Sequence, residues 1–118
     1  MIGMKQVPAE VLAELANEFA AGLPARAAVM REALDELAEG RSVDAAQRLR
    51  LTAHALAGTA SAFGARELAP HAERLESLGK QWQETQGVAG AADMARANEA
   101  LAQLTAMIDI VNERLRIR

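Results

Sequence analysis

Apolar residues recur along this chain at steps of three and four, the spacing that places side chains on one face of an α-helix. In the segment 24–40, for example, Ala27, Met30, Leu34 and Leu37 follow one another at these steps. The last segment of the chain shows the same spacing, with one step of seven (Met94, Leu101, Leu104, Ile108, Val111 and Leu115). No segment alternates apolar and polar residues as a β-strand does. The chain is therefore predicted to be all-α.

The composition indicates helices that pack closely through small side chains. Hydrophobic residues make up 51% of the 118 residues, whereas aromatic residues make up only 3%. Much of the apolar fraction is alanine, which is the best helix former and lets helix axes approach one another. The length fits one domain with one core, so residues 1–118 are predicted to form a single domain.

Helix-breaking residues divide the chain into about five helical segments. Gly22 and Pro24 interrupt the pattern early, and Gly40 ends the second segment. Ser42 is a candidate N-cap of the third segment, and Gly64 closes that segment as the residue after the helix. The fourth segment runs from about residue 66 into the eighties. It carries Leu68, Ala72, Leu75 and Trp82 inward and has Pro70 near its first turn; Gly87 and Gly90 mark the loop that follows.

Four long amphipathic helices with short connections predict an antiparallel four-helix bundle over residues 23–118. Residues 1–22 are predicted to form an additional short N-terminal helix that caps one end of the bundle. The apolar stripe of the last helix is complete, so a monomer is expected.

Composition also narrows the function. There is no cysteine, which excludes disulfides and thiolate metal sites. No apolar run reaches membrane-spanning length and no signal peptide is visible, so a cytoplasmic protein without a membrane partner is expected. The net charge of −3 argues against nucleic acid as a partner. Neither a glycine-rich phosphate loop nor a nucleophile–base–acid set is present.

A histidine stands in the middle of the third segment, in the stretch LTAHALAGTASAFG from Leu51 to Gly64. His54 follows Ala53, which is predicted to point inward, so the imidazole lies about 100° further round the helix. At that position another protein can reach the ring. Gly58 lies one turn later on the same side and costs about 1 kcal/mol relative to alanine. It either allows close helix packing or clears the approach to the imidazole.

The third and fourth segments form a hairpin whose turn lies near Gly64 and Ala65. Antiparallel pairing about that turn brings Glu76 level with His54, both about 16 Å from the turn at 1.5 Å per residue. A carboxylate there can accept a hydrogen bond from the histidine Nδ1–H and leave Nε2 unprotonated and nucleophilic. The alternative is that Glu76 is an ordinary solvated helix residue.

Together these residues resemble the histidine-containing phosphotransfer (HPt) domain family. The residues that carry the motif are His54, Leu56, Gly58, Ala60 and Gly64. Leu23-Pro24, the Glu39-Gly40 loop and Leu75-Glu76 also fall where such domains tend to have them. The resemblance covers most of the chain from about Leu23 onward.

The resemblance implies a phosphorelay protein of two-component signal transduction. It implies that His54 is the phosphoacceptor at Nε2, that Gly58 gives a partner close access, and that Glu76 orients the ring. Such a domain takes a phosphoryl group from a receiver aspartate or a hybrid histidine kinase and passes it to another receiver. It needs no cofactor, because any magnesium is held by the receiver. The chain would then be a phosphoryl carrier without kinase activity of its own.

One position departs from the family pattern. Three residues after the histidine the family usually carries Lys or Arg, whereas this chain has Ala57. Three alternatives follow. Arg50 can substitute for that cation, or the partner can supply it. In the third, the site is weakened and the protein is an adaptor that docks receivers or kinases without transfer. Arg50 can also be simply a solvated helix charge. The predicted docking surface is the exposed face around His54 on the second and third segments. Its candidate residues surround the histidine on the third segment (Arg50, Leu51, Ala55, Ala57, Ser61 and Ala62).

Other features of the sequence indicate a metal site less well than they indicate an ordinary helix surface. Glu67 and His71 have a spacing that can bind a metal, but no matching motif exists on a second helix, and no metal site is expected. The Met1 start fits a free-standing protein, and a piece of a hybrid kinase is the alternative. Richness in alanine and arginine favours a bacterial source.

Overall fold

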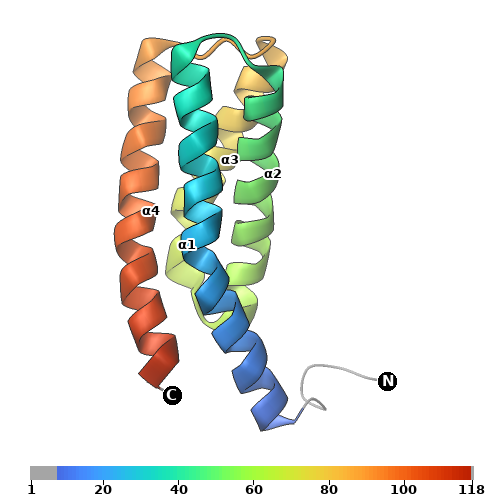
Figure 1. Ribbon diagram of the computed structural model, residues 1–118, viewed down its shortest axis with the longest axis vertical. Helices are drawn as coiled ribbons and strands as arrows, with labels where there is room; N and C mark the ends of the chain where they lie inside the picture. The colour runs from blue at the N-terminus through green and yellow to red at the C-terminus, as the bar shows by residue number, and fades with distance from the viewer. Residues whose placement is uncertain (1–7, 118) are drawn as a thin grey trace.

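The computed structural model describes residues 8–117 of the chain. Its four α-helices are α1 (Ala9–Glu39), α2 (Val43–Ala60), α3 (Ala69–Glu84) and α4 (Ala91–Ile117), and this part of the chain contains no strand. Figure 1 shows the helices side by side, each antiparallel to the one before it. The predicted all-α four-helix bundle is confirmed. None of the described helices is long and apolar enough to cross a membrane.

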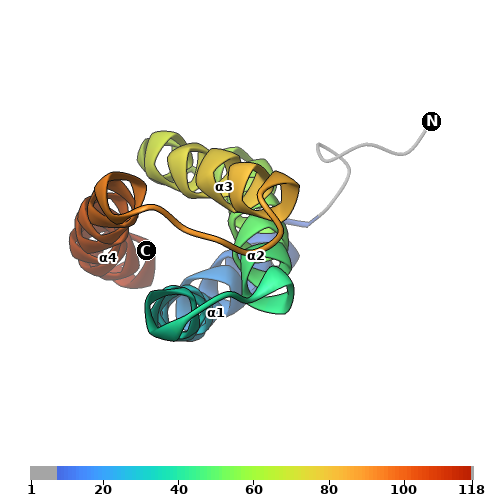
Figure 2. The same ribbon diagram turned by 90° about the horizontal axis from the view of Figure 1, so that it is seen from above.

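The helices follow one another around the bundle in chain order. Each helix packs against the one before and the one after it, and α4 returns to pack against α1. Seen from above, α2 and α3 make one side of the bundle, and α1 and α4 make the opposite side (Figure 2). A residue pair shared by α2 and α3 therefore lies on the face turned away from the α1–α4 contact.

The core of the bundle is built from leucine and alanine. In α2 the buried side chains are mostly alanines (Ala45, Ala46, Leu49, Ala53, Leu56 and Ala60). Because alanine adds little bulk, α2 can lie close to its neighbours while the leucines fill the space between them. Near the α2–α3 turn, Phe63 is half-buried and stacks on Phe19 of α1, with ring centroids 5.0 Å apart.

The ends of α2 and α3 follow the predicted capping residues. The Ser42 hydroxyl accepts a hydrogen bond from the Ala45 backbone N–H at 3.0 Å, as an N-cap residue does. Gly64 adopts the left-handed conformation, with φ of 74°. Pro70 lies in the first turn of α3, where its missing N–H leaves no helix hydrogen bond unmade. α2 ends at Ala60, earlier than predicted, because residues 61–63 tighten into a 3-10 turn.

The predicted N-terminal capping helix is not a separate element. Residues 9–22 are the first part of α1, which continues through Gly22 and Pro24 without a break. In Figure 1 this part extends α1 at one end of the bundle, and the helix axis bends along its length, as an interior proline predicts. Residues 1–7 of the predicted cap lie outside the described part of the chain.

Packing explains why the helix continues through the proline. Phe19, Ala20 and Leu23 are buried before Pro24, and Met30 is buried after it. Both parts of α1 are thus anchored to the same core. A proline inside a helix costs about 3 kcal/mol, and burial of several large side chains at about 1.5–3 kcal/mol each offsets this cost.

An arginine of α4 ties that helix to the α2–α3 turn. Arg114 Nη2 donates hydrogen bonds to Glu67 Oε1 at 3.1 Å and to the Gly64 carbonyl oxygen at 2.6 Å. The hydrogen bond from Arg114 is the main cause that lowers the pKa of Glu67 in the folded protein below the ordinary value of 4.5. The ionised Glu67 carboxylate therefore stabilises the fold.

This contact predicts a defined loss of stability in acid. The contribution is fully present above about pH 4.5, the ordinary value, and disappears as the pH falls through the lower pKa of folded Glu67. Glu67→Gln should reduce the free energy of unfolding at pH 7 and flatten its decline below pH 4.5. Urea unfolding at several pH values measures this, with Glu73→Gln on the exposed side of α3 as the control. An unchanged pH profile in Glu67→Gln would contradict the assignment.

Candidate functional site

His54 lies in the middle of α2 with its ring facing solvent. Its neighbours Ala53 and Leu56 are fully buried and fix this stretch of helix against the core. The histidine side chain itself is 70% exposed. The imidazole is thus held on a rigid helix and remains open to another molecule.

Glu76 of α3 reaches across to this ring. Its Oε2 lies 2.8 Å from His54 Nδ1, as the register of the hairpin predicts. A carboxylate can only accept a hydrogen bond, so Nδ1 carries the hydrogen in this pair. In the neutral imidazole Nε2 then keeps its lone pair. In that form of the ring, the two side chains together present a nitrogen with a free lone pair at the surface.

Gly58 leaves open space on the same side of α2. A Cβ atom built there would meet no other atom within 4 Å. Close helix packing therefore does not explain this glycine, and clear access to the imidazole stays a prediction. No side chain projects from α2 at this position, one turn after His54.

Arg50 lies one turn before His54 and is engaged with α3. Its Nε donates a hydrogen bond to Gln83 Oε1, and its side chain is half-buried. Arg50 and Gln83 line a hollow beside the histidine pair together with Glu76, Lys80 and Glu84. Gln83 and Lys80 were not predicted as site residues, because a polar residue on a solvated helix face gives no separate signal. Arg50 is therefore not the freely solvated charge of the alternative interpretation.

The remaining predicted partner-binding residues surround His54 to different extents. Leu51 is 48% exposed, and Ala55, Ser61 and Ala62 are exposed, whereas Ala57 is half-buried against the core. The exposed Val29 of α1 extends this apolar surface beyond α2. A shallow hollow between the two helices joins these side chains (Ala25, Arg26, Val29, Leu51, Thr52 and Ala55). The predicted docking surface included the segment 24–40, which is part of α1, but Val29 was not named, since only the packing of α1 against α2 shows that it faces this side.

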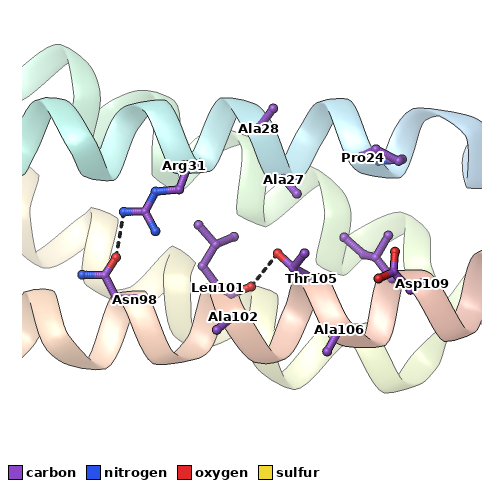
Figure 3. A pocket seen from close by; sticks show the side chains of 11 residues that line it. Pro24, Ala27, Ala28, Arg31, Asn98, Leu101, Ala102, Thr105, Ala106 and Asp109 are labelled. Carbon is purple, nitrogen blue, oxygen red and sulfur yellow. Dashed lines mark hydrogen bonds between the residues drawn. The ribbon is translucent and has the colours of Figure 1, made fainter.

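Two other places on the bundle lie apart from the His54–Glu76 pair. Glu67 binds Arg114, and residues 8–117 contain no group of three His, Asp or Glu side chains that could hold a metal ion. A groove of about 650 Å³ lies between α1 and α4, on the face opposite α2 and α3. Figure 3 shows that small side chains such as Ala28, Ala102 and Ala106 line it, with Arg31 and Asn98 hydrogen-bonded at one end. It holds none of the predicted site residues.

Comparison with known proteins assigns the family. The family model for the Hpt domain matches residues 14–113 of the chain. The chain belongs to the HPt domain family. No curated protein and no solved structure matches it. Membership of this family supports a histidine phosphotransfer role in phosphorelays, in which HPt domains interact with receiver and kinase domains.

The match covers all the elements that build the site. It begins in the part of α1 that was predicted to be a separate cap and ends in α4. His54 and Glu76 therefore both lie inside the matched HPt domain, on its α2–α3 face. Ala57, where the family usually carries a basic residue, lies inside it too.

The hydrogen bond predicts which ring nitrogen of His54 carries the proton. Glu76→Ala removes the acceptor, so the proton should move from Nδ1 toward Nε2. Long-range ¹H–¹⁵N NMR of the ring measures this shift. The free energy of unfolding should change by less than about 1 kcal/mol, because the histidine partner is 70% exposed and solvent screens the contact.

Glu76→Gln is the matched control for this experiment. Its amide oxygen can accept the same hydrogen bond, so the proton should remain on Nδ1. If Glu76→Ala also kept the proton on Nδ1, Glu76 would not set the tautomer.

Proposed function

We propose that this HPt domain carries a phosphoryl group on His54 Nε2, taking it from a receiver aspartate or a kinase and passing it to another receiver. The observation that carries the proposal is the contact between the exposed His54 ring and the Glu76 carboxylate, 2.8 Å from Nδ1. A nucleophile that must enter the active site of another protein has to be accessible, oriented and unprotonated at the attacking atom. The exposure of the ring and the Glu76 contact supply access and orientation, and in the neutral ring the contact at Nδ1 leaves Nε2 unprotonated.

The transfer step uses the two ring nitrogens differently. The Nε2 lone pair attacks the phosphorus of the aspartyl phosphate in line, the N–P bond forms, and the P–O bond to the aspartate breaks. The receiver carboxylate leaves with the electron pair, and no proton has to move. The ring becomes positively charged as the bond forms, so the Nδ1–H···Glu76 hydrogen bond becomes charge-assisted and stronger. Glu76 thus stabilises the phosphorylated state as well as orienting the ring.

The partner supplies the remaining catalytic groups in this proposal. Catalysis of phosphoryl transfer consists mainly of positioning and of stabilising the charge on the phosphoryl oxygens. The receiver contributes its magnesium ion and lysine, and the HPt domain contributes the positioned nucleophile and needs no cofactor of its own. The low surface at Gly58 lets the receiver bring these groups close to Nε2.

The apolar surface of α1 and α2 beside His54 is the proposed docking surface. Leu51 and Val29 are both large, aliphatic and exposed there, and Ala55 lines the same hollow. Exposed aliphatic side chains around a polar reactive centre are typical of the core of a transient protein interface. Arg26 also lines this hollow, and Arg50 precedes Leu51 on α2.

One observation favours a second function, that of an adaptor that docks receivers without transfer. The usual basic residue is absent at Ala57, and Arg50, the nearest substitute on α2, is hydrogen-bonded to Gln83. The hydrogen-bonded His54–Glu76 pair favours the carrier, because an adaptor has no need to fix the tautomer of a surface histidine.

His54→Gln decides between carrier and adaptor. Receiver domains charged with acetyl phosphate are mixed with the parent and with this variant, and labelling of the HPt chain is measured. The parent should acquire an acid-labile, base-stable phosphate, and the variant should acquire none. Binding of receivers to both proteins without labelling of either supports the adaptor and contradicts the carrier.

Leu51→Glu tests the docking surface. A charge at the centre of the apolar surface should weaken receiver binding by at least about tenfold, the effect of losing a central contact of 1.4 kcal/mol or more. Ile110→Glu is the matched control, because Ile110 is 57% exposed and lies on α4, diagonally across the bundle from α2. Calorimetry of receiver binding gives both constants. Equal weakening by the two changes would place the docking surface elsewhere.

A further inference from the structure

α2 and α3 touch at a glycine close to the His54–Glu76 pair. A Cβ atom built at Gly79 of α3 would lie 2.8 Å from the backbone N of Arg50 and 3.0 Å from its Cα. Carbon atoms in ordinary van der Waals contact are 3.5–4.0 Å apart. The atoms in the way belong to the α2 backbone, so they cannot move aside as the end of a flexible side chain could. Any side chain at position 79 would have to push the two helices apart by something on the order of 1 Å.

The contact lies about one helical turn from the site on both helices. Arg50 precedes His54 by four residues in α2, and Gly79 follows Glu76 by three residues in α3. At 1.5 Å per residue the separation along the bundle is about 5–6 Å. Helices are stiff over so short a length, so a displacement at Gly79 passes nearly undiminished to the Nδ1–Oε2 distance of 2.8 Å.

Gly79 and Gly58 are in different situations although both stand inside helices. Gly58 faces open space, whereas Gly79 is buried and faces backbone. A glycine inside a helix costs about 1 kcal/mol relative to alanine, and at position 79 this cost is offset by the close approach of α3 to α2. The hydrogen bond from Arg50 to Gln83, one turn further along α3, spans the same contact.

We propose that Gly79 is a positioning residue of the phosphorylation site, whose missing side chain lets α3 lie close enough to Arg50 for Glu76 to reach His54. The expected effect of Gly79 on phosphoryl transfer rests on the function proposed above, whereas its effect on the histidine ring does not. The residue touches neither the phosphoryl group nor the partner.

Gly79→Ala tests the proposal in two ways. The ring proton of His54 should move from Nδ1 toward Nε2 in long-range ¹H–¹⁵N NMR, and the rate of phosphoryl transfer should fall by about tenfold, within the roughly 100-fold that a misplacement of 1 Å can cost. Gly22→Ala is the matched control: it also lies inside a helix, and its Cβ would meet only the end of the Arg26 side chain, at 3.3 Å. The control should change neither quantity.

A double-mutant cycle separates positioning from general damage to the fold. If Gly79 acts through Glu76, then Gly79→Ala should cause little further loss of transfer when Glu76 is already alanine. An equal loss in both backgrounds would overturn the proposal, as would a ring proton that stays on Nδ1 in Gly79→Ala. If circular dichroism shows partial unfolding, the NMR measurement is made with trimethylamine N-oxide, which favours the folded state.

The NMR result does not depend on any receiver. A shifted ring proton in Gly79→Ala together with a parent that no receiver labels would support the positioning role and contradict the phosphoryl carrier. Normal labelling of the parent by receivers, together with a ring proton that stays on Nδ1 in Gly79→Ala, would support the phosphoryl carrier and contradict the positioning role.

Discussion

The close antiparallel packing of α2 against α3 is the constraint on which the site depends. Most buried positions of α2 are alanines, and Gly79 of α3 lies directly against the Arg50 backbone. Small residues on both sides let the helix axes approach until a glutamate on one helix reaches a histidine on the other. The core therefore contributes more than stability, because its small side chains set the distance across which the His54–Glu76 hydrogen bond forms.

In the proposed function, that hydrogen bond explains how a histidine on the surface of the bundle takes part in phosphoryl transfer. The ring is exposed, so a partner can enclose it, and the proton is held on the inner nitrogen, so the outer one is ready to react. The chain places few other groups around Nε2: Gly58 offers no side chain, Ala57 offers no charge, and Arg50 is engaged with Gln83. In the proposed function the receiver brings the cations, and the surface around His54 is shaped to admit them.

The sequence predicted much of the fold and the main pair of the site. Apolar spacing indicated the helices, Ser42 and Gly64 indicated helix ends, and pairing about the hairpin turn placed Glu76 level with His54. These predictions rest on helix geometry, which acts locally and repeats. The break at Pro24 was wrong because burial of Phe19 and Leu23 outweighs the local preference of proline, and local sequence does not show that burial. The contact of Gly79 with Arg50 could not be predicted either, because it depends on how closely two helices approach. The sequence alone also does not show why position 58 is a glycine.

The central claim is that Glu76 holds the proton on Nδ1 and so makes Nε2 the nucleophile. It is tested most directly by determining which atom of the chain carries the phosphoryl group after charging by a receiver. ³¹P NMR of the phosphorylated protein distinguishes the two ring nitrogens from each other and from a carboxylate. We expect a single phosphoryl group on Nε2 of His54. A group on Nδ1, or on any other residue, would contradict it.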